Sequence, residues 1–203
     1  MFLAGEDSIM ETEGVILAAG KSSRMAGVAK MAMDLNGRTV VERTIESLHP
    51  FCSRIIVVTG FHAEAVVESA GHCAEAIFVH NPDCEKGMFS SLRLGLRHTE
   101  AERVLFLPGD CPFITREVCE KLLAAKGDIV LPAYQGKSGH PVLLSRHAIE
   151  GLLADERCES LQEYIQANGP EIIAVDLPEI LWDIDTPEDY ANAVDYFQAK
   201  EQR

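Results

Sequence analysis

The chain has 203 residues, of which 47% are hydrophobic and 25% charged, and its formal net charge is −14. This size and composition suit one globular domain with a sizeable core. The acidic balance argues against binding to nucleic acid or to an anionic membrane, because both need a basic surface. The sequence contains no run of about 18 apolar residues, so no membrane span is predicted.

Residues 1–13 form an acidic stretch without the basic-then-apolar pattern of a signal peptide. We expect this stretch to be a flexible extension, residues 14–203 to form a single domain, and the chain to be cytoplasmic. The six cysteines are scattered without a C-x-x-C pair, which predicts reduced thiols rather than a zinc site or a disulfide framework.

Short apolar runs alternate with amphipathic stretches along the first two thirds of the chain. Runs rich in β-branched residues predict strands, and apolar residues at helical spacing predict helices. Strands are predicted at 15–19, 54–60, 75–81, 103–110 and 128–132, and helices at 39–48, 63–71, 87–98 and 115–127. This alternation is typical of βαβ units on a mainly parallel sheet with both faces covered.

The pattern changes after residue 132. Residues 136–146 (GKSGHPVLLSR) predict a turn and a strand, antiparallel and at an edge of the sheet. Short helices at 147–154 and 160–167 and a strand at 171–177 follow. A closing helix over 186–200 begins with Thr-Pro-Glu-Asp, which supplies an N-cap, a proline in the first turn and acidic residues at the positive helix end.

The stretch GVILAAGKSSRMAGVAK, residues 14–30, runs from the first predicted strand into a loop of small and basic residues. Gly20-Lys21-Ser22 resembles the end of a Walker A loop, but the pattern G-x-x-x-x-G-K-[ST] needs a glycine at the position of Val15. The fingerprint G-x-G-x-x-G also fails, because the next glycine after Gly20 is Gly27. Both familiar phosphate loops are therefore excluded.

The same loop is a basic stretch in an acidic chain. Residues 14–33 contain no Asp or Glu, whereas Lys21, Arg24 and Lys30 all lie there. Small residues let backbone N–H groups approach an anion, and the cations neutralise it. The loop also leaves the carboxyl end of a predicted strand, where open α/β sheets bind ligands. This predicts a site for a small anion; chance clustering on a solvated loop is the alternative.

Five motifs, in order along residues 15–190, resemble those of nucleotidyltransferases with a Rossmann-like, glycosyltransferase-A type fold. They are LAAGKSSRM with a following lysine, NPDCEKGMFSSLRLGL, LFLPGDCPFI, GKSGHPVLLSR and DIDTPEDY. The chain is most similar to the molybdenum cofactor cytidylyltransferase-like (MobA/MocA-like NTP transferase) family. The resemblance implies that residues 14–203 are one nucleotidyltransferase domain, with an α/β fold of three α/β/α layers, a mostly parallel sheet and an antiparallel edge strand.

The resemblance also implies a reaction. An acceptor phosphate oxygen attacks the α-phosphorus of a nucleoside triphosphate and releases pyrophosphate. Alanine at the position of Ala19 is associated in the family with CTP, and glycine with GTP. The implied substrates are CTP and molybdopterin, with Mg²⁺ or Mn²⁺ as the metal and a molybdoenzyme as the recipient of the product.

Candidate site residues follow predicted strands or lie in the motifs. A carboxylate at the position of Asp110 suits a Mg²⁺ ligand that faces a triphosphate, although Gly-Asp-x-Pro also favours a plain turn. Asp183 and Asp185 share one face of an extended segment; Asp185 is the expected second metal ligand, or else a cap of the last helix. The resemblance implies catalysis by Lys21, Arg24, Lys30 and Asp110, nucleotide binding by Leu17, Ala18, Ala19, Gly20, Thr59, Gly60, Asn81, Gly87 and Ser91, and acceptor binding by His140 and Asp183.

Two departures from the family pattern leave alternatives open. The glycine that usually follows Arg-Met comes one residue late, after Ala26, and residues 152–161 lack a family glycine turn. The second departure keeps a sugar- or alcohol-phosphate nucleotidyltransferase as an alternative, and His140 can equally be a structural residue of its turn. A further alternative is a non-catalytic nucleotide-binding accessory protein of a molybdoenzyme, but a protein that only binds need not retain three cations and both carboxylates.

Overall fold

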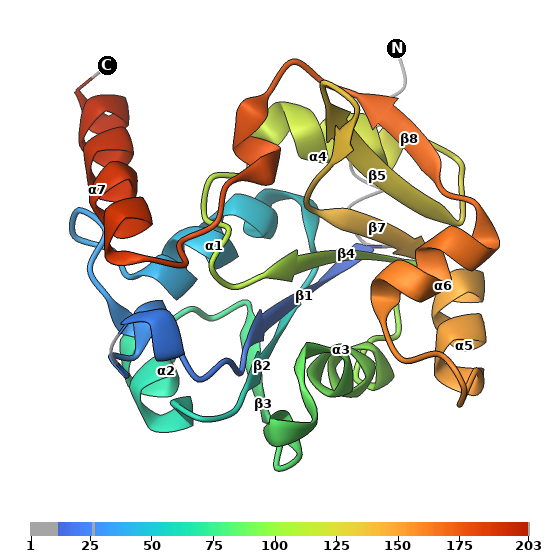
Figure 1. Cartoon of the computed structure of the whole chain (residues 1–203), viewed down its shortest axis with the longest axis horizontal. Coiled ribbons are helices and arrows are strands. Elements are labelled where there is room, and N and C mark those ends of the chain that lie inside the picture. Colours follow the sequence, from blue (N-terminus) through green and yellow to red (C-terminus); the bar gives the residue numbers. More distant parts are fainter. Residues whose placement is uncertain (1–11, 26, 203) are drawn as a thin grey trace.

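Apolar, β-branched runs build an eight-stranded mixed sheet in the computed structural model, which describes residues 12–25 and 27–202 (Figure 1). The strand order is β3-β2-β1-β4-β7-β5-β6, and β8 also pairs with β5. The strands are β1 (Thr12–Ala18), β2 (Ile55–Thr59), β3 (Ala76–His80), β4 (Arg103–Pro108), β5 (Ile129–Tyr134), β6 (Lys137–Ser138), β7 (Val142–Ser145) and β8 (Glu171–Ala174).

Seven α-helices among the described residues cover the sheet on both faces, so the predicted three-layer α/β fold is confirmed. Alternate residues of β1 show the division: Ile16 belongs to a buried cluster with residues of α1, α2, α4 and α7, whereas Val15 belongs to a second cluster with residues of α3, α5 and α6. The helices are α1 (Val40–Leu48), α2 (Ala63–Ala70), α3 (Met88–Arg97), α4 (Arg116–Ala124), α5 (Arg146–Ala154), α6 (Leu161–Asn168) and α7 (Pro187–Glu201). No helix of the described residues is long and apolar enough to cross a bilayer.

The antiparallel part of the sheet differs in position from the sequence prediction. Of β6 and β7, only the two-residue β6 comes at the end of the strand order, where it pairs antiparallel with β5. The longer β7 is antiparallel as predicted, but it lies inside the sheet, between β4 and β5. Its residues Val142, Leu143 and Leu144 are buried, which is the pattern of a strand covered on both faces.

The first strand begins two residues earlier than the predicted start of the domain. Thr12 and Glu13 belong to β1 and are buried, while residues 1–11 lie outside the described residues. The Glu13 carboxylate accepts the backbone N–H groups of Glu100 (2.6 Å) and Ala101 (3.0 Å) and pairs with Arg54. These contacts tie the start of β1 to the loop that precedes β4.

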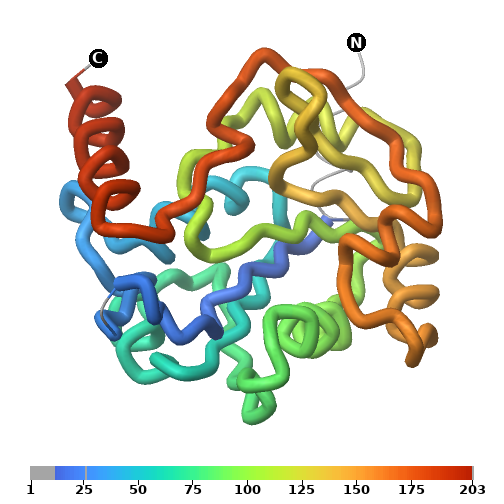
Figure 2. Tube along the Cα trace, viewed as in Figure 1, coloured from blue at the N-terminus to red at the C-terminus, as the bar shows by residue number. Residues whose placement is uncertain are grey.

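The last helix returns to the N-terminal half of the molecule. Figure 2 traces the chain from the orange α6 to the red α7, which lies on the side of the blue and cyan segments. Arg43 of α1 pairs with Glu201 at the end of α7, at 2.7 Å. At its start, Thr186 and Asp189 form a capping box, as the Thr-Pro-Glu-Asp sequence predicts. This return brings the segment 183–186 close to the carboxyl ends of the central strands.

Candidate functional site

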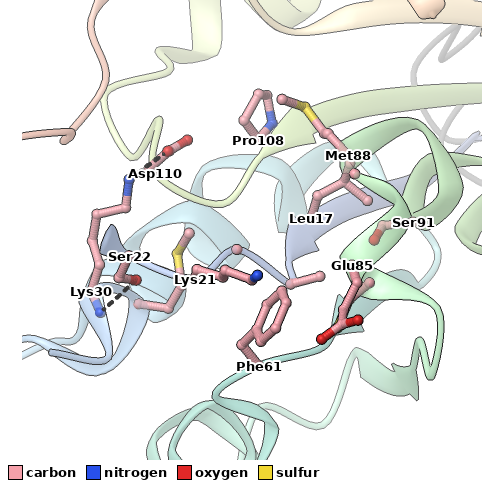
Figure 3. A pocket seen from close by; sticks show the side chains of 15 residues that line it. Leu17, Lys21, Ser22, Lys30, Phe61, Glu85, Met88, Ser91, Pro108 and Asp110 are labelled. Carbon is pink, nitrogen blue, oxygen red and sulfur yellow. Dashed lines mark hydrogen bonds and ion pairs between the residues drawn. The ribbon is translucent and has the colours of Figure 1, made fainter. Parts of the chain in front are cut away.

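A cavity of about 420 Å³ opens beyond the carboxyl ends of β1 and β4 (Figure 3). The loop that follows β1 forms one wall, and the start of α3 forms the opposite wall. Eight residues that the sequence singled out line the cavity: Leu17, Ala19, Gly20, Lys21, Lys30, Gly87, Ser91 and Asp110. The position agrees with the rule that open α/β sheets bind ligands at the carboxyl ends of their strands.

Lys30 joins the two predicted metal ligands. Its Nζ atom donates to Oδ2 of Asp110 at 2.8 Å and to Oδ1 of Asp185 at 3.0 Å. Burial alone would lower the pKa of the Lys30 ammonium, but the charges and hydrogen bonds of Asp110 and Asp185 outweigh burial, so the pKa lies above its ordinary value. Arg24, which is exposed, pairs with the other oxygen of Asp185.

Backbone contacts bring these carboxylates together. Asp110 follows β4 through Gly109, where an added Cβ would lie 2.7 Å from the carbonyl oxygen of Leu17, so only glycine allows this close approach. The N–H of Ile184 donates to the carbonyl oxygen of Asp110 at 2.9 Å, and the N–H of Asp185 donates to the Asp189 carboxylate at 3.1 Å. The segment 183–185 is therefore held beside the end of β4.

The third carboxylate, Asp183, lies within electrostatic range of the other two. Partial burial, followed by the charge of Asp185, raises the pKa of the Asp183 carboxyl. Within residues 12–25 and 27–202, no group of three or more His, Cys, Asp or Glu side chains is arranged to hold a metal ion. Asp110 and Asp185 alone fit Mg²⁺, because this ion takes one or two carboxylates and completes its shell with water and phosphate oxygens.

Several lining residues were missed from the sequence. Phe61, which follows β2, lies under Lys21, with the Lys21 Nζ 4.6 Å from the ring centre (Figure 3). Its place beyond a neighbouring strand end is the signal that could have identified it, because parallel strands present their carboxyl ends along one edge. Ser22, Met31, Cys84, Glu85, Met88 and Pro108 also line the cavity and were not predicted.

Four predicted nucleotide-binding residues do not line the cavity. Ala18 and Thr59 are buried, and a Cβ on Gly60 would lie 2.9 Å from Cβ of Ala19, so Gly60 backs the cavity wall. Asn81 is buried and donates from Nδ2 to the hydroxyls of Ser90 (3.0 Å) and Ser91 (2.8 Å). These residues support the wall from behind.

The bend that the sequence places at Ala26-Gly27 is described only in part. Ala26 lies outside the described residues, and Gly27 has a φ of +80°, a conformation that favours glycine. Beyond the bend, the backbone N–H of Lys30 donates to the Ser22 hydroxyl at 3.3 Å. This bond closes the loop on itself.

His140 lies in a second cavity of about 560 Å³, and Met88 lines both cavities. Burial lowers the pKa of His140 to about 4, so the imidazole is neutral near pH 7. Its ring packs edge-on against Phe106, and its Nδ1 atom is buried without a hydrogen-bond partner among the described residues. Asp183 lines neither of these cavities; it borders a separate pocket beside Trp182.

Comparisons with known proteins identify the family of the chain and structures with a similar fold. Residues 14–172 match the model of a family described as the MobA-like NTP transferase domain. The molybdenum cofactor cytidylyltransferase of Escherichia coli (strain K12) is 29% identical over 180 residues, which are 88% of this chain and 93% of that protein. The molybdenum cofactor guanylyltransferase of Photobacterium profundum is 26% identical over 90% of this chain and 95% of that protein. The structure of a nucleotidyl transferase from Methanothermobacter thermautotroptrophicus superposes with a TM-score of 0.80, at 25% identity over 94% of this chain and 99% of that chain.

Proposed function

The chain belongs to the family of MobA-like NTP transferases, and on that premise we propose that it transfers CMP from CTP to the phosphate of molybdopterin, with release of pyrophosphate. The observation that carries this proposal is a group of cations and carboxylates: Lys21, Lys30 and Asp110 line one cavity beyond β1 and β4, and Asp185 contacts Lys30. The product would pass to a molybdoenzyme.

The loop after β1 would hold the triphosphate. The small residues Ala19 and Gly20 allow its oxygens to approach the backbone, and Lys21 and Lys30 bring positive charge to the cavity. Such fixed charges stabilise the negative charge that grows on the pyrophosphate leaving group. Catalysis of this kind needs positioning and charge, and no covalent intermediate.

Asp110 and Asp185 would hold Mg²⁺ or Mn²⁺ through carboxylate oxygens. When bound, the metal would supply positive charge that stabilises the triphosphate during attack by the acceptor phosphate oxygen. The protein itself keeps the two carboxylates together through two hydrogen bonds. The N–H of Ile184 donates to the carbonyl oxygen of Asp110, and the N–H of Asp185 donates to the Asp189 carboxylate.

The nucleobase would lie against the wall formed by Ala19. The side chain of Ala19 is buried, and a Cβ on Gly60 would lie 2.9 Å from Cβ of Ala19, so Gly60 lies directly behind this wall. A wall that carries a methyl group leaves less room than one made by glycine, which supports cytosine over the larger guanine. The cytidylyltransferase among the similar proteins supports the same choice.

The second cavity supports a heterocyclic acceptor. Its described lining contains no Asp, Glu, Lys or Arg, and its polar groups are Ser138, His140, Ser160, Gln162 and Gln166. Its walls are otherwise apolar, with Leu92, Phe106 and Val142 all buried. An uncharged site with amide, hydroxyl and imidazole groups suits a neutral ring system such as a pterin better than it suits a polyol or a second phosphate.

A panel of substrates tests the proposal. Purified protein is incubated with Mg²⁺, each of the four ribonucleoside triphosphates, and molybdopterin, a sugar phosphate or an alcohol phosphate, and pyrophosphate release is measured. We expect turnover with CTP and molybdopterin. Asp110→Asn should lower kcat by roughly 10²-fold or more, because it removes a charged group of the site. Glu117→Gln, on an exposed side chain of α4, is the matched control.

Three results would contradict the proposal in different ways. Turnover of a sugar phosphate but not of molybdopterin would identify a different acceptor. A preference for GTP would reassign the nucleotide. Full activity in Asp110→Asn would show that this carboxylate takes no part in the reaction, as expected for a protein that only binds nucleotide.

A further inference from the structure

Lys30 lies between the two carboxylates that the proposed function assigns to the metal. Its Nζ atom is 2.8 Å from Oδ2 of Asp110 and 3.0 Å from Oδ1 of Asp185, and only 8% of its side chain is exposed. The backbone of the same residue is held by the bond from its N–H to the Ser22 hydroxyl. Lys30 is therefore an ordered part of the site and not a surface ion pair.

Three of the four carboxylate oxygens of Asp110 and Asp185 already face a cation. Oδ1 of Asp185 accepts from Lys30 and Oδ2 accepts from Arg24, so both oxygens of this carboxylate already face a positive charge. Mg²⁺ binds carboxylate oxygens at about 2.0–2.1 Å. An ion at that distance from the oxygens that Lys30 contacts would lie against the ammonium group, where repulsion between the two cations is strong.

The balance of charge explains why a lysine is needed there. Asp183 lies within electrostatic range of Asp110 and Asp185, and it makes no ion pair within the described part of the chain. Without Lys30, only the exposed Arg24 would compensate them. Buried or half-buried like charges destabilise a fold strongly unless a counter-charge is present.

We propose that Lys30 serves as a built-in counter-cation that excludes the divalent metal from the nucleotide-free site, and that an arriving triphosphate draws Lys30 away and so opens the site to the metal. This inference rests on the proposed function, because it assumes that Asp110 and Asp185 are the metal ligands. Lys30 lines the cavity as well as contacting Asp110 (Figure 3), and its four-carbon stem allows the ammonium group to change partners. Metal and nucleotide then bind cooperatively, since each favours the state in which Lys30 has left the carboxylates.

Metal binding without nucleotide tests the proposal. Mn²⁺ is titrated into wild-type protein, Lys30→Met and Lys126→Met, and free Mn²⁺ is measured by electron paramagnetic resonance. Lys126→Met is the matched control, because it removes the same charge from an exposed side chain that does not line the cavity. We expect Lys30→Met to bind Mn²⁺ roughly tenfold to a hundredfold more tightly than wild type, and Lys126→Met to bind like wild type.

Thermal unfolding gives a second measurement. Lys30→Met should be less stable than wild type in the absence of metal, and Mn²⁺, but not Na⁺ at equal ionic strength, should restore the lost stability. If Lys30→Met unfolds on purification, its recovery by Mn²⁺ is the expected result, and failure to recover would overturn the proposal.

The outcomes separate this proposal from the one on which it rests. Equal Mn²⁺ affinity in wild type and Lys30→Met, or weaker affinity in the variant, would overturn the role of Lys30 and leave the metal site intact. Absence of Mn²⁺ binding from all three proteins, with or without CTP, would overturn the metal site and the role of Lys30 together.

Discussion

Among single residues, His140 carries a titratable ring that the fold keeps neutral. Burial lowers its pKa from 6.5 to about 4, even though the charge of Asp110 acts in the opposite direction. The N–H of His140 donates to the carbonyl oxygen of Ile180 at 2.9 Å, so the residue also joins the start of β7 to the segment before Asp183. Protonation would place a charge among apolar neighbours such as Phe106.

This environment predicts a loss of stability at acidic pH. Between about pH 6.5 and pH 4 the unfolded chain binds a proton at His140 and the folded chain does not, so the free energy of unfolding falls as the pH falls through this window. The full difference amounts to about 3 kcal/mol. Urea unfolding at pH 7.0 and pH 4.5 should show a smaller decrease for His140→Gln than for wild type.

A matched variant isolates the contribution of His140, because other groups also titrate in this range. His147 is exposed at the start of α5, and His147→Gln should retain the wild-type pH dependence. The same decrease in His140→Gln as in wild type would show that His140 can be protonated without cost in the folded protein.

Residue types could be predicted better than residue partners. The spacing of motifs identified Lys30, Asp110 and Asp185 individually, but Lys30 was expected on the phosphates and not on the carboxylates that it contacts. Ion pairs between residues 80 and 155 positions apart depend on tertiary packing, which no local pattern records. Glu13 was missed for the same reason, since the backbone N–H groups that its carboxylate accepts follow the third helix of the chain.

At the scale of elements, α3 lies unusually close to the sheet at one residue. A Cβ added to Gly95 would lie 2.7 Å from Cγ1 of Val15 and 2.9 Å from Cγ2 of Val58. Both valines are fully buried in central strands, where β-branched side chains have little rotational freedom. The absence of a side chain therefore allows α3 to approach the strands whose ends border the cavity.

Gly95→Ala should destabilise the protein even though alanine is the better helix former. Helix propensity favours alanine by about 1 kcal/mol, whereas overpacking in a closed core costs about 1–3 kcal/mol. We expect a net loss of about 1 kcal/mol in the free energy of unfolding, measured in urea, and weaker nucleotide binding. Arg97→Ala, on the exposed side of α3, should change stability by less than about 0.5 kcal/mol. A Gly95→Ala protein more stable than wild type would show that α3 can move away from β1 at no cost.

The elements themselves followed from local sequence, whereas their order in the sheet did not. Continuous apolar runs predicted β1, β2, β4 and β5, and the Thr-Pro-Glu-Asp start predicted the capping box of α7. The interior position of β7 could not be inferred, because a short apolar run reads alike at an edge and between two strands. Pairing order is a property of the whole sheet.

At the scale of the whole molecule, three distant segments form the site. The loop after β1, the turn after β4 and the segment before α7 meet because β1 and β4 are neighbours in the sheet and α7 returns across it. The motif order predicted that the three segments act together, while the return of the chain through η5 (Pro178–Leu181) became visible only in the structure. The basic loop after β1, which contains no Asp or Glu, thus contacts Asp185 of the segment before α7 through Arg24 and Lys30.

Ligand binding at this junction should stabilise the entire fold. A ligand at a concentration 100 times its Kd adds about 2.7 kcal/mol to the free energy of unfolding, and each 1 kcal/mol raises the Tm of a protein of this size by about 2–4 °C. CTP with Mg²⁺ at such a concentration should therefore raise Tm by roughly 5–10 °C in differential scanning fluorimetry, and GTP with Mg²⁺ by less. Chelation of the metal by EDTA should remove most of the shift, because the triphosphate then loses the positive charge of the metal that Asp110 and Asp185 would hold. Glu117→Gln should respond like wild type, whereas Asp110→Asn should lose the part of the shift that depends on metal.

A CTP shift that is unchanged by EDTA would mean that the nucleotide binds without the metal, and the coupling between the three segments would then have to come from the cations alone.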